Sequence, residues 1–155
     1  MTVETPIGAL ELTCKDRKIT RCKWVAASAA SEETPPPDGF EIEIISQLKE
    51  YFEGCRSAFS LPIEIDGTEF QKKVWRELLN VKYGETVTYG EIARRIGNPG
   101  ALRAVGTACK MNPIAILVPC HRVVAAGGKP GGYNGGMEKK FYLLELEMSF
   151  GKFKT

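Results

Sequence analysis

The chain has 155 residues, 43% hydrophobic and 26% charged, which is typical of a globular protein with one domain or two small ones. No apolar run is long enough to span a bilayer, and the N-terminus lacks a basic segment followed by an apolar one, so we expect a cytoplasmic protein. Residues 1–66 carry seven basic and twelve acidic side chains, against fourteen and seven in residues 67–155. The net charges of −5 and +7 make the second part the candidate for contact with nucleic acid, although basic side chains that merely solvate a surface would give the same balance.

The cysteines predict neither disulfides nor a metal site. Their number, five, is odd, and no CxxC pair occurs. The single histidine, His121, and the scattered cysteines do not have zinc-ligand spacing, so we expect no metal. Cys14, Cys22, Cys55 and Cys109 are expected to be small buried hydrophobic side chains.

Residues 1–66 predict a small α+β domain. Alternating apolar and polar side chains predict a hairpin over residues 9–25, and the small, polar and proline-rich residues 26–39 predict a loop. Alternation over residues 60–66 indicates another strand. A helix is expected over residues 40–52 because apolar side chains recur there at helical spacing: Ile42, Ile45, Leu48 and Phe52.

Residues 67–155 predict a second, mainly helical domain. Helices are expected over residues 68–79, with Thr68 as N-cap, and over 88–96, 101–111 and 136–148. The second and third of these are joined by a tight Asn-Pro-Gly turn, as in a helix-turn-helix. The inward side of the last helix is expected to be Met137, Phe141, Leu144 and Met148.

The helix over residues 101–111 has two different faces. One face carries the apolar side chains of Leu102, Val105 and Cys109. The other is basic and small, and consists of Arg103, Ala104, Thr107 and Lys110. Small side chains would let this helix approach a DNA groove closely, but an ordinary surface helix would show the same pattern.

An apolar segment, expected to be a strand, leads from Pro113 into Cys120 and His121. A thiol becomes a good nucleophile only when it is deprotonated, and a nearby imidazole or cation can promote that step. Adjacent side chains on a strand point in opposite directions, so these two would need a turn or a bridging water to communicate. The pattern indicates an activated thiol.

Residues 119–123, Pro-Cys-His-Arg-Val, form a highly specific motif, and other segments accompany it. They are Tyr89 within Val87–Ala93, Arg103–Gly106, Asn112-Pro113, Gly132–Gly136 and Glu147. At these residues the chain resembles the O6-alkylguanine-DNA alkyltransferases, also called methylated-DNA–protein-cysteine methyltransferases. The resemblance covers residues 67–148 and is weaker before them, where residues 5–8 also fit.

The resemblance implies a ribonuclease H-like N-terminal domain followed by a winged helix-turn-helix domain. It implies direct DNA repair, in which the alkyl group of O6-alkylguanine, or less well O4-alkylthymine, is transferred irreversibly to Cys120, without a cofactor. The partner would be double-stranded DNA with a flipped-out base. We expect a monomer in solution, associated with the nucleoid in a prokaryote, and leave cooperative DNA binding open.

The resemblance also implies roles for single residues. Cys120 would attack the alkyl carbon, His121 would deprotonate it through a water, and Glu147 would orient His121. Asn112 would hold the turn around the acceptor. Tyr89 would donate a proton or hydrogen bond to the leaving guanine and displace the 3′ phosphate, and Arg103 would occupy the space that the base leaves.

The remaining implied site residues contact DNA or bound the base pocket. Ala104, Thr107 and Lys110 would lie against DNA on the helix of Arg103. Val123, Tyr133 and Asn134 would bound the base pocket, with Lys140 near the pocket loop. Two of these residues depart from the family pattern: Thr107 stands where Gly is frequent, and Asn134 where a Ser or another small residue is common. This sequence shows none of three features that occur in parts of the family: the zinc ligands of some members, a fused regulatory domain, and the Trp that replaces the acceptor in a lesion-sensing subgroup.

Other interpretations remain open from the sequence alone. Glu147 is also explained as a solvated carboxylate paired with Lys140, Tyr89 as a packing residue, and Asn112 as a helix C-cap. For the whole chain, the rivals are a cysteine hydrolase that uses Cys120 and His121, and a winged-helix DNA-binding protein whose Cys120 is merely buried.

Overall fold

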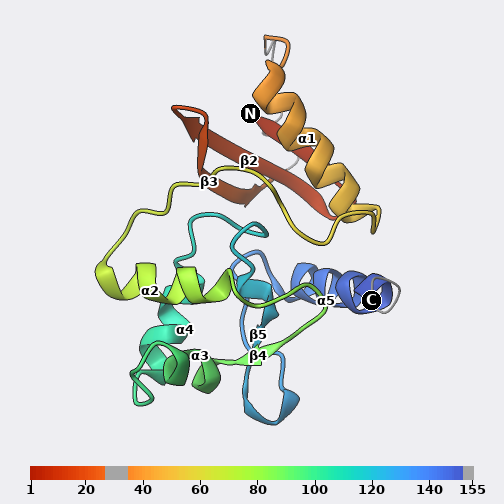
Figure 1. Cartoon of the computed structure of the whole chain (residues 1–155). Helices are drawn as coiled ribbons and strands as arrows, with labels where there is room; N and C mark the ends of the chain where they lie inside the picture. The colour runs from red at the N-terminus through yellow and green to blue at the C-terminus, as the bar shows by residue number, and fades with distance from the viewer. Residues whose placement is uncertain (27–34, 152–155) are drawn as a thin grey trace.

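The computed structural model describes residues 1–26 and 35–151, and its first part is a three-stranded antiparallel sheet packed against one helix (Figure 1). Strands β1 (Thr2–Thr5), β2 (Gly8–Lys15) and β3 (Lys18–Val25) follow one another in the sheet. The predicted hairpin is the β2–β3 pair, whereas β1 was not predicted. Asp16 and Arg17 both have positive φ, as in hairpin turns that fit the twist of the strands.

Helix α1 (Gly39–Phe52) begins where the predicted loop ends. The Asp38 side chain caps it by accepting a hydrogen bond from the Glu41 amide at 2.8 Å. Its buried face carries Phe40, Ile44, Leu48 and Tyr51, whereas Ile42, one of the side chains whose spacing predicted the helix, is 55% exposed. Residues 27–34 of the predicted loop lie outside the described residues.

The strand predicted over residues 60–66 is not formed. Only Ile63 pairs, in an isolated parallel bridge to Ile19 at β3. Pro62, which has no amide hydrogen to donate, offers its carbonyl to the Ile19 amide at 2.9 Å. The segment instead connects the two parts of the chain in an extended conformation (Figure 1).

Four α-helices make up most of the second part, as predicted: α2 (Glu69–Leu78), α3 (Tyr89–Arg95), α4 (Leu102–Lys110) and α5 (Met137–Gly151). Thr68 and Gln71 form a capping box at the start of α2. Helices α3 and α4 pack against each other and against α2 as a helix-turn-helix. Two short strands, β4 (Val87–Thr88) and β5 (Val123–Val124), pair in parallel beside them.

The apolar segment before Cys120 is a buried loop, so the predicted strand was wrong. Turn hydrogen bonds join the Leu117 amide to the Ala115 carbonyl and the Val118 amide to the Ile114 carbonyl. Ile116 has a φ of 70°, an uncommon conformation for a β-branched residue. The chain thus turns repeatedly beneath the sheet, and only Ile114 bridges to Cys22 of β3.

Helix α5 buries a different face from the one predicted. Leu143 and Leu146 are buried with Lys140 and Glu147, whereas Phe141 and Met148 are 50% and 56% exposed. Lys140 and Glu147 lie on this buried face with separate partners: Lys140 donates to the Val123 carbonyl, and Glu147 contacts His121.

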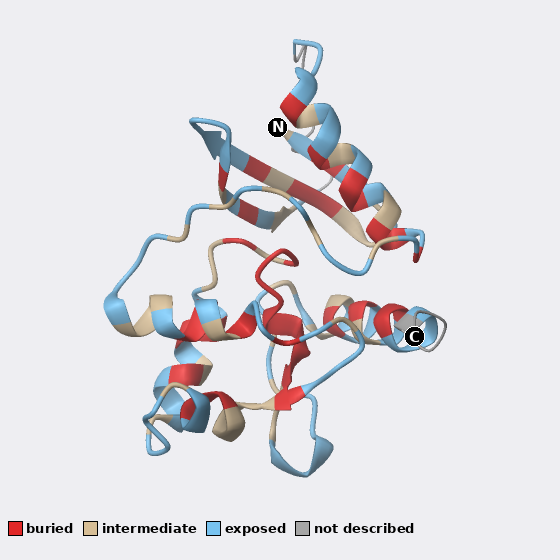
Figure 2. Cartoon of the chain, viewed as in Figure 1, coloured by how far each residue is buried: buried red, intermediate tan, exposed pale blue. Residues whose placement is uncertain are grey.

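The two parts share one apolar core, which continues from the sheet and α1 into the buried loop and the helices (Figure 2). Cys22 and Cys109 are buried as predicted, but Cys14 and Cys55 are exposed. No helix within residues 1–26 and 35–151 combines the length and apolar character needed to cross a membrane. The fold is α+β, with a sheet domain followed by a mainly helical one.

Candidate active site

A single turn of 3-10 helix, Cys120–Arg122, carries the predicted nucleophile, and all three side chains are buried. The Asn112 side chain supports this turn from the end of α4. Its Nδ2 donates to Cys120 Sγ at 3.1 Å and to the Val118 carbonyl at 2.8 Å, and its Oδ1 accepts from the Ile114 amide. Asn112 therefore holds both the buried loop and the sulfur.

The second turn residue, His121, faces Glu147 of α5. His121 Nε2 lies 2.6 Å from Glu147 Oε2, and both side chains are almost fully buried. Arg122 reaches the same carboxylate with Nε at 2.7 Å and Nη2 at 3.1 Å. Glu147 is thus neither solvated nor paired with Lys140.

Burial and pairing set the protonation states of these groups. Burial raises the pKa of the Cys120 thiol, although the hydrogen bond from Asn112 opposes the rise. Burial also lowers the pKa of His121, against the pull of Glu147. Burial opposes ionisation of Glu147, but the charge and hydrogen bonds of His121 and Arg122 outweigh it and lower its pKa to about 2. Arg122 contributes a full charge and two hydrogen bonds to this lowering whatever the protonation state of His121.

The ionised carboxylate also fixes the tautomer of His121. A carboxylate only accepts hydrogen bonds, so His121 Nε2 carries the proton. Nδ1 is then the basic nitrogen of the neutral ring, and it has no hydrogen-bond partner within the described part of the chain. At neutral pH the site therefore combines a thiol, an imidazole that can accept a proton at Nδ1, and a carboxylate.

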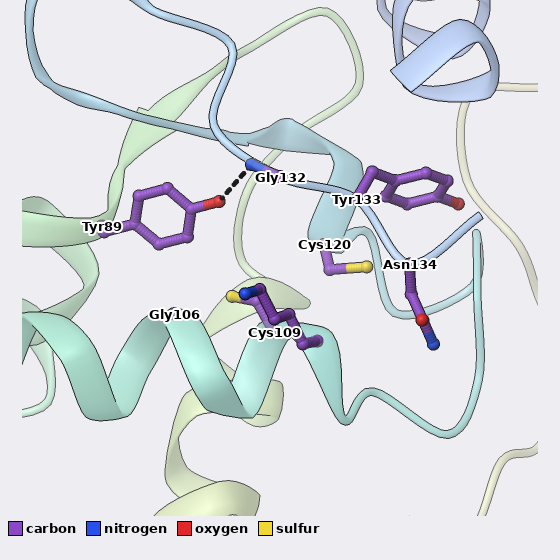
Figure 3. A pocket seen from close by; sticks show the side chains of 8 residues that line it. Tyr89, Gly106, Cys109, Cys120, Gly132, Tyr133 and Asn134 are labelled. Atoms are coloured by element: carbon purple, nitrogen blue, oxygen red, sulfur yellow. Dashed lines mark hydrogen bonds between the residues drawn. The ribbon is translucent and has the colours of Figure 1, made fainter. Parts of the chain in front are cut away.

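The glycine-rich segment of residues 131–136 closes over Cys120 (Figure 3). The Gly132 amide donates to Tyr89 Oη at 3.3 Å, and Gly131 has a φ of 70° with no room for a side chain, because a Cβ there would lie 2.7 Å from that oxygen. Between this segment and α4, Tyr89, Cys120 and Tyr133 line a cavity of about 10 Å³. This is room for about one water, so the cavity as it stands is too small for a larger group.

A second cavity, of about 180 Å³, reaches Cys120 from the side of the sheet. Asn112, Tyr133 and Asn134 line it together with Trp24 of β3. Trp24 Nε1 donates to Tyr133 Oη at 3.1 Å, which joins the sheet domain to the glycine-rich segment. Cys120 thus lines both the 10 Å³ and the 180 Å³ cavity.

Lys140 and Val123 line neither cavity. Lys140 is fully buried, and its Nζ donates to the Val123 carbonyl at 2.6 Å and to the Gly132 carbonyl at 2.9 Å. Burial lowers the pKa of this lysine. Lys140 therefore fastens α5 to β5 and to the glycine-rich segment, and Val123 takes part through its backbone.

The exposed face of α4 lies next to this site. Arg103, Ala104, Thr107 and Lys110 are all exposed on it. An open groove of about 390 Å³ runs along the helix and is lined by Tyr89, Leu102, Arg103, Gly106, Thr107 and Lys110. Leu102, expected on the buried side, is 53% exposed there. Tyr89 and Lys110 also line the 10 Å³ cavity, so the groove leads to the acceptor.

Sequence analysis missed three residues of the site. The contact of Arg122 with Glu147 was not predicted, although its position inside the Pro-Cys-His-Arg-Val motif was an available signal. Tyr51 Oη donates to Glu147 Oε2 at 2.6 Å, and Trp24 contacts Tyr133. Both belong to the sheet domain, and nothing in their local sequence indicates a site. No group of three potential His, Cys, Asp or Glu metal ligands occurs among the described residues.

Comparison with known proteins places the chain in a family. The model for "6-O-methylguanine DNA methyltransferase, ribonuclease-like domain" matches residues 1–65, and the model for the DNA binding domain of the same proteins matches residues 69–149. The methylated-DNA–protein-cysteine methyltransferase of Mycobacterium tuberculosis is 46% identical over 151 residues, 96% of this chain and 91% of that protein. The protein of the same name from Methanosarcina acetivorans is 45% identical over 152 residues, 94% and 96% of the two chains.

Solved structures agree with the sequence comparison. The crystal structure of M. tuberculosis OGT in complex with DNA superposes with a TM-score of 0.87 at 46% identity, over 96% of this chain and 92% of that one. An O6-methylguanine DNA methyltransferase from Methanococcus jannaschii gives a TM-score of 0.72 at 29% identity, over 96% and 93%. The chain belongs to the 6-O-methylguanine DNA methyltransferase family.

Proposed function

We propose that this protein repairs alkylated DNA directly, by moving the alkyl group from O6 of guanine to Cys120 Sγ. The observation that supports it best is the placement of a hydrogen-bonded thiol beside the His121–Glu147 pair and next to the exposed basic face of α4. The acceptor is consumed, because a thioether has no easy reverse reaction. Each molecule therefore reacts once, without a cofactor.

Proton transfer comes first. The Cys120 thiol gives its proton, through one bridging water, to His121 Nδ1, the nitrogen that the tautomer leaves free. Glu147 stabilises the imidazolium that forms, as a carboxylate beside the ring. Asn112 Nδ2 stays in hydrogen-bond reach of the sulfur and stabilises the thiolate.

Alkyl transfer follows as an SN2 displacement. The thiolate forms an S–C bond to the alkyl carbon while the C–O6 bond breaks, and the electron pair moves into the guanine ring. Tyr89 supplies a proton or hydrogen bond to a ring nitrogen of the leaving guanine. Its oxygen accepts from the Gly132 amide, so its own hydrogen is available to donate. The leaving guanine gains one proton in place of the alkyl group, and this balances the proton that Cys120 gave to His121.

DNA binding supplies the base. A stacked guanine hides its O6 substituent, so it must be flipped out, at a cost of a few kcal/mol. Arg103 fills the space in the stack, while Ala104, Thr107 and Lys110 lie against the backbone and groove. Tyr133, Asn134 and the backbone near Val123 bound the base, and Lys140 holds the segment that closes over it. We expect the protein to act as a cytoplasmic monomer, with residues 1–66 and 67–155 as its two domains.

Intact-mass analysis after incubation with O6-methylguanine DNA, or with free O6-benzylguanine, tests the proposal. We expect one alkyl adduct per chain, absent from Cys120→Ser and unchanged in Cys14→Ser, whose thiol is exposed. Wild-type protein without an adduct contradicts the proposal. Turnover of a small ester would favour a cysteine hydrolase, and tight DNA binding without an adduct would favour a DNA-binding protein without chemistry.

A further inference from the structure

The carboxylate that supports His121 has a partner in the other domain. Glu147 Oε2 accepts hydrogen bonds from His121 Nε2 and from Tyr51 Oη, both at 2.6 Å. Tyr51 is on α1, 96 positions from Glu147 in sequence, and both side chains are buried. The same oxygen therefore serves the proposed base and a residue of the sheet domain.

The Tyr51 ring is held firmly in this place. It lies edge-on to Phe52, with centroids 5.2 Å apart, and edge-on to Tyr83 at 6.1 Å. Phe59, from the segment that connects the domains, packs at 5.4 Å. Only 1% of Tyr51 is exposed. A ring fixed on several sides brings its hydroxyl to one point, so the oxygen that it contacts is fixed as well.

The hydroxyl always acts as the donor in this contact. Burial and the adjacent Glu147 carboxylate raise the pKa of Tyr51 well above its usual value, so the phenol stays protonated at any pH at which the protein works. Its hydrogen points to Glu147 Oε2, because an ionised carboxylate can only accept. Oε2 therefore divides its charge among Tyr51, His121 and, at 3.1 Å, Arg122 Nη2.

We propose that Tyr51 is a positioning residue for alkyl transfer, which lets the N-terminal domain set the orientation and basicity of His121 through Glu147. The inference rests on the function proposed above. Without the Tyr51 hydroxyl, Oε2 would lose one of its three donors, and its charge would be shared between His121 and Arg122 Nη2 alone. The imidazole would then be less well oriented and more basic.

The charged and titratable groups around the His121–Glu147 pair come from every adjacent element. They are Tyr51 of α1, Tyr83 of the segment after α2, Cys120 and Arg122 of the 3-10 turn, Tyr133 of the glycine-rich segment, and Lys140 of α5. Arg122 and Lys140 lower the pKa of His121, whereas Glu147 raises it. Removing the Tyr51 hydroxyl leaves the other groups in place and strengthens only the effect of Glu147 on the pKa of His121.

His121 is the only histidine of the chain, so the imidazole NMR spectrum of a tag-free protein contains one ring. In the wild type we expect a neutral Nε2–H tautomer of His121, with a titration midpoint below that of an ordinary histidine. In Tyr51→Phe the midpoint should rise by about half a pH unit or more. The rate of alkyl transfer from O6-benzylguanine should fall about three- to tenfold, and the acid limb of its pH profile should move upward with the midpoint.

Tyr142→Phe is the matched control, because Tyr142 is a partly exposed tyrosine on α5 near Phe52, and both readouts should keep their wild-type values. If Tyr51→Phe fails to fold, 3-fluorotyrosine at position 51 gives the opposite test: a more acidic phenol is a stronger donor and should lower the midpoint. A His121 midpoint and a transfer rate that are unaltered by the change at position 51 would overturn the inference. Wild-type protein that forms no adduct would instead overturn the proposed function, and the titration would still report the contact.

Discussion

Replacing Glu147 with Gln tests the electrostatic description of the site, because the change keeps the shape of the side chain and removes its charge. Arg122, His121 and Tyr51 all direct hydrogen bonds at this carboxylate, which is 1% exposed. In Glu147→Gln the buried guanidinium of Arg122 loses its counter-ion. Breaking a buried ion pair in this way costs about 3–5 kcal/mol, a large part of the total stability of a small protein.

The pKa of Glu147 gives a second route to the magnitude. Its folded value of about 2 lies below the usual 4.5, so ionisation favours the folded state. At 1.36 kcal/mol per unit, the ionised group contributes about 3 kcal/mol. Because the folded pKa is the lower one, this contribution is complete above about pH 4.5 and is lost as the pH falls towards 2. The two routes agree in size.

Urea unfolding at several pH values measures the effect. At pH 7 we expect Glu147→Gln to lower the free energy of unfolding by about 3 kcal/mol, and the deficit should shrink between pH 4.5 and pH 2 as the wild type loses its own advantage. Glu145→Gln, on the exposed side of α5, should change stability by less than about 0.5 kcal/mol. If Glu147→Gln is as stable as the wild type at pH 7, or if its deficit in the free energy of unfolding does not vary with pH, the description is refuted.

Three further changes test other parts of the site. Arg103→Ala should slow repair of duplex DNA at least tenfold more than reaction with free O6-benzylguanine, since only the duplex requires flipping; equal losses in the two rate measurements would contradict its role. Asn112→Ala removes a hydrogen-bond donor from Cys120 Sγ, so the thiol pKa, read from the pH dependence of iodoacetamide alkylation, should rise further; an unchanged or lower value would be inconsistent with the 3.1 Å contact. Gly135→Ala places a Cβ 2.4 Å from the Trp24 ring, so thermal unfolding should occur several degrees lower and transfer should slow, whereas Gly106→Ala, with open space at its Cβ inside α4, should leave the melting temperature unaltered or raise it, because alanine favours a helix more than glycine does.

The sequence predicted the elements of the fold better than their orientation. Helix bounds agree within a few residues, because caps such as Thr68 and the 3.6-residue period are local signals. On α5 the period pointed to the wrong face. Lys140 and Glu147 are buried because partners distant in sequence neutralise or bind them, and a hydropathy pattern assigns such side chains to solvent.

The residues of the candidate site also differ in how far the sequence could predict them. Cys120 and His121 are adjacent, and their residue types are enough to indicate an activated thiol, whereas Asn112 was placed with them only by the family resemblance. Tyr51 and Trp24 come from the sheet domain, and their contacts depend on how the two domains pack. The loop before Cys120 was mistaken for a strand because its apolar residues are buried on all sides, which a run of hydrophobic letters cannot distinguish from a buried strand.

The Glu147 carboxylate lies on α5 and accepts hydrogen bonds from α1, from Gly84 after α2 and from the 3-10 turn. Local opening of any of these segments removes part of the hydrogen-bond network that holds His121 and Glu147. The proposed proton acceptor for Cys120 therefore has its full set of contacts only when all of these segments are folded. It follows that stoichiometric labelling by an O6-benzylguanine probe would count native molecules in a preparation, one label for each chain whose two domains are assembled.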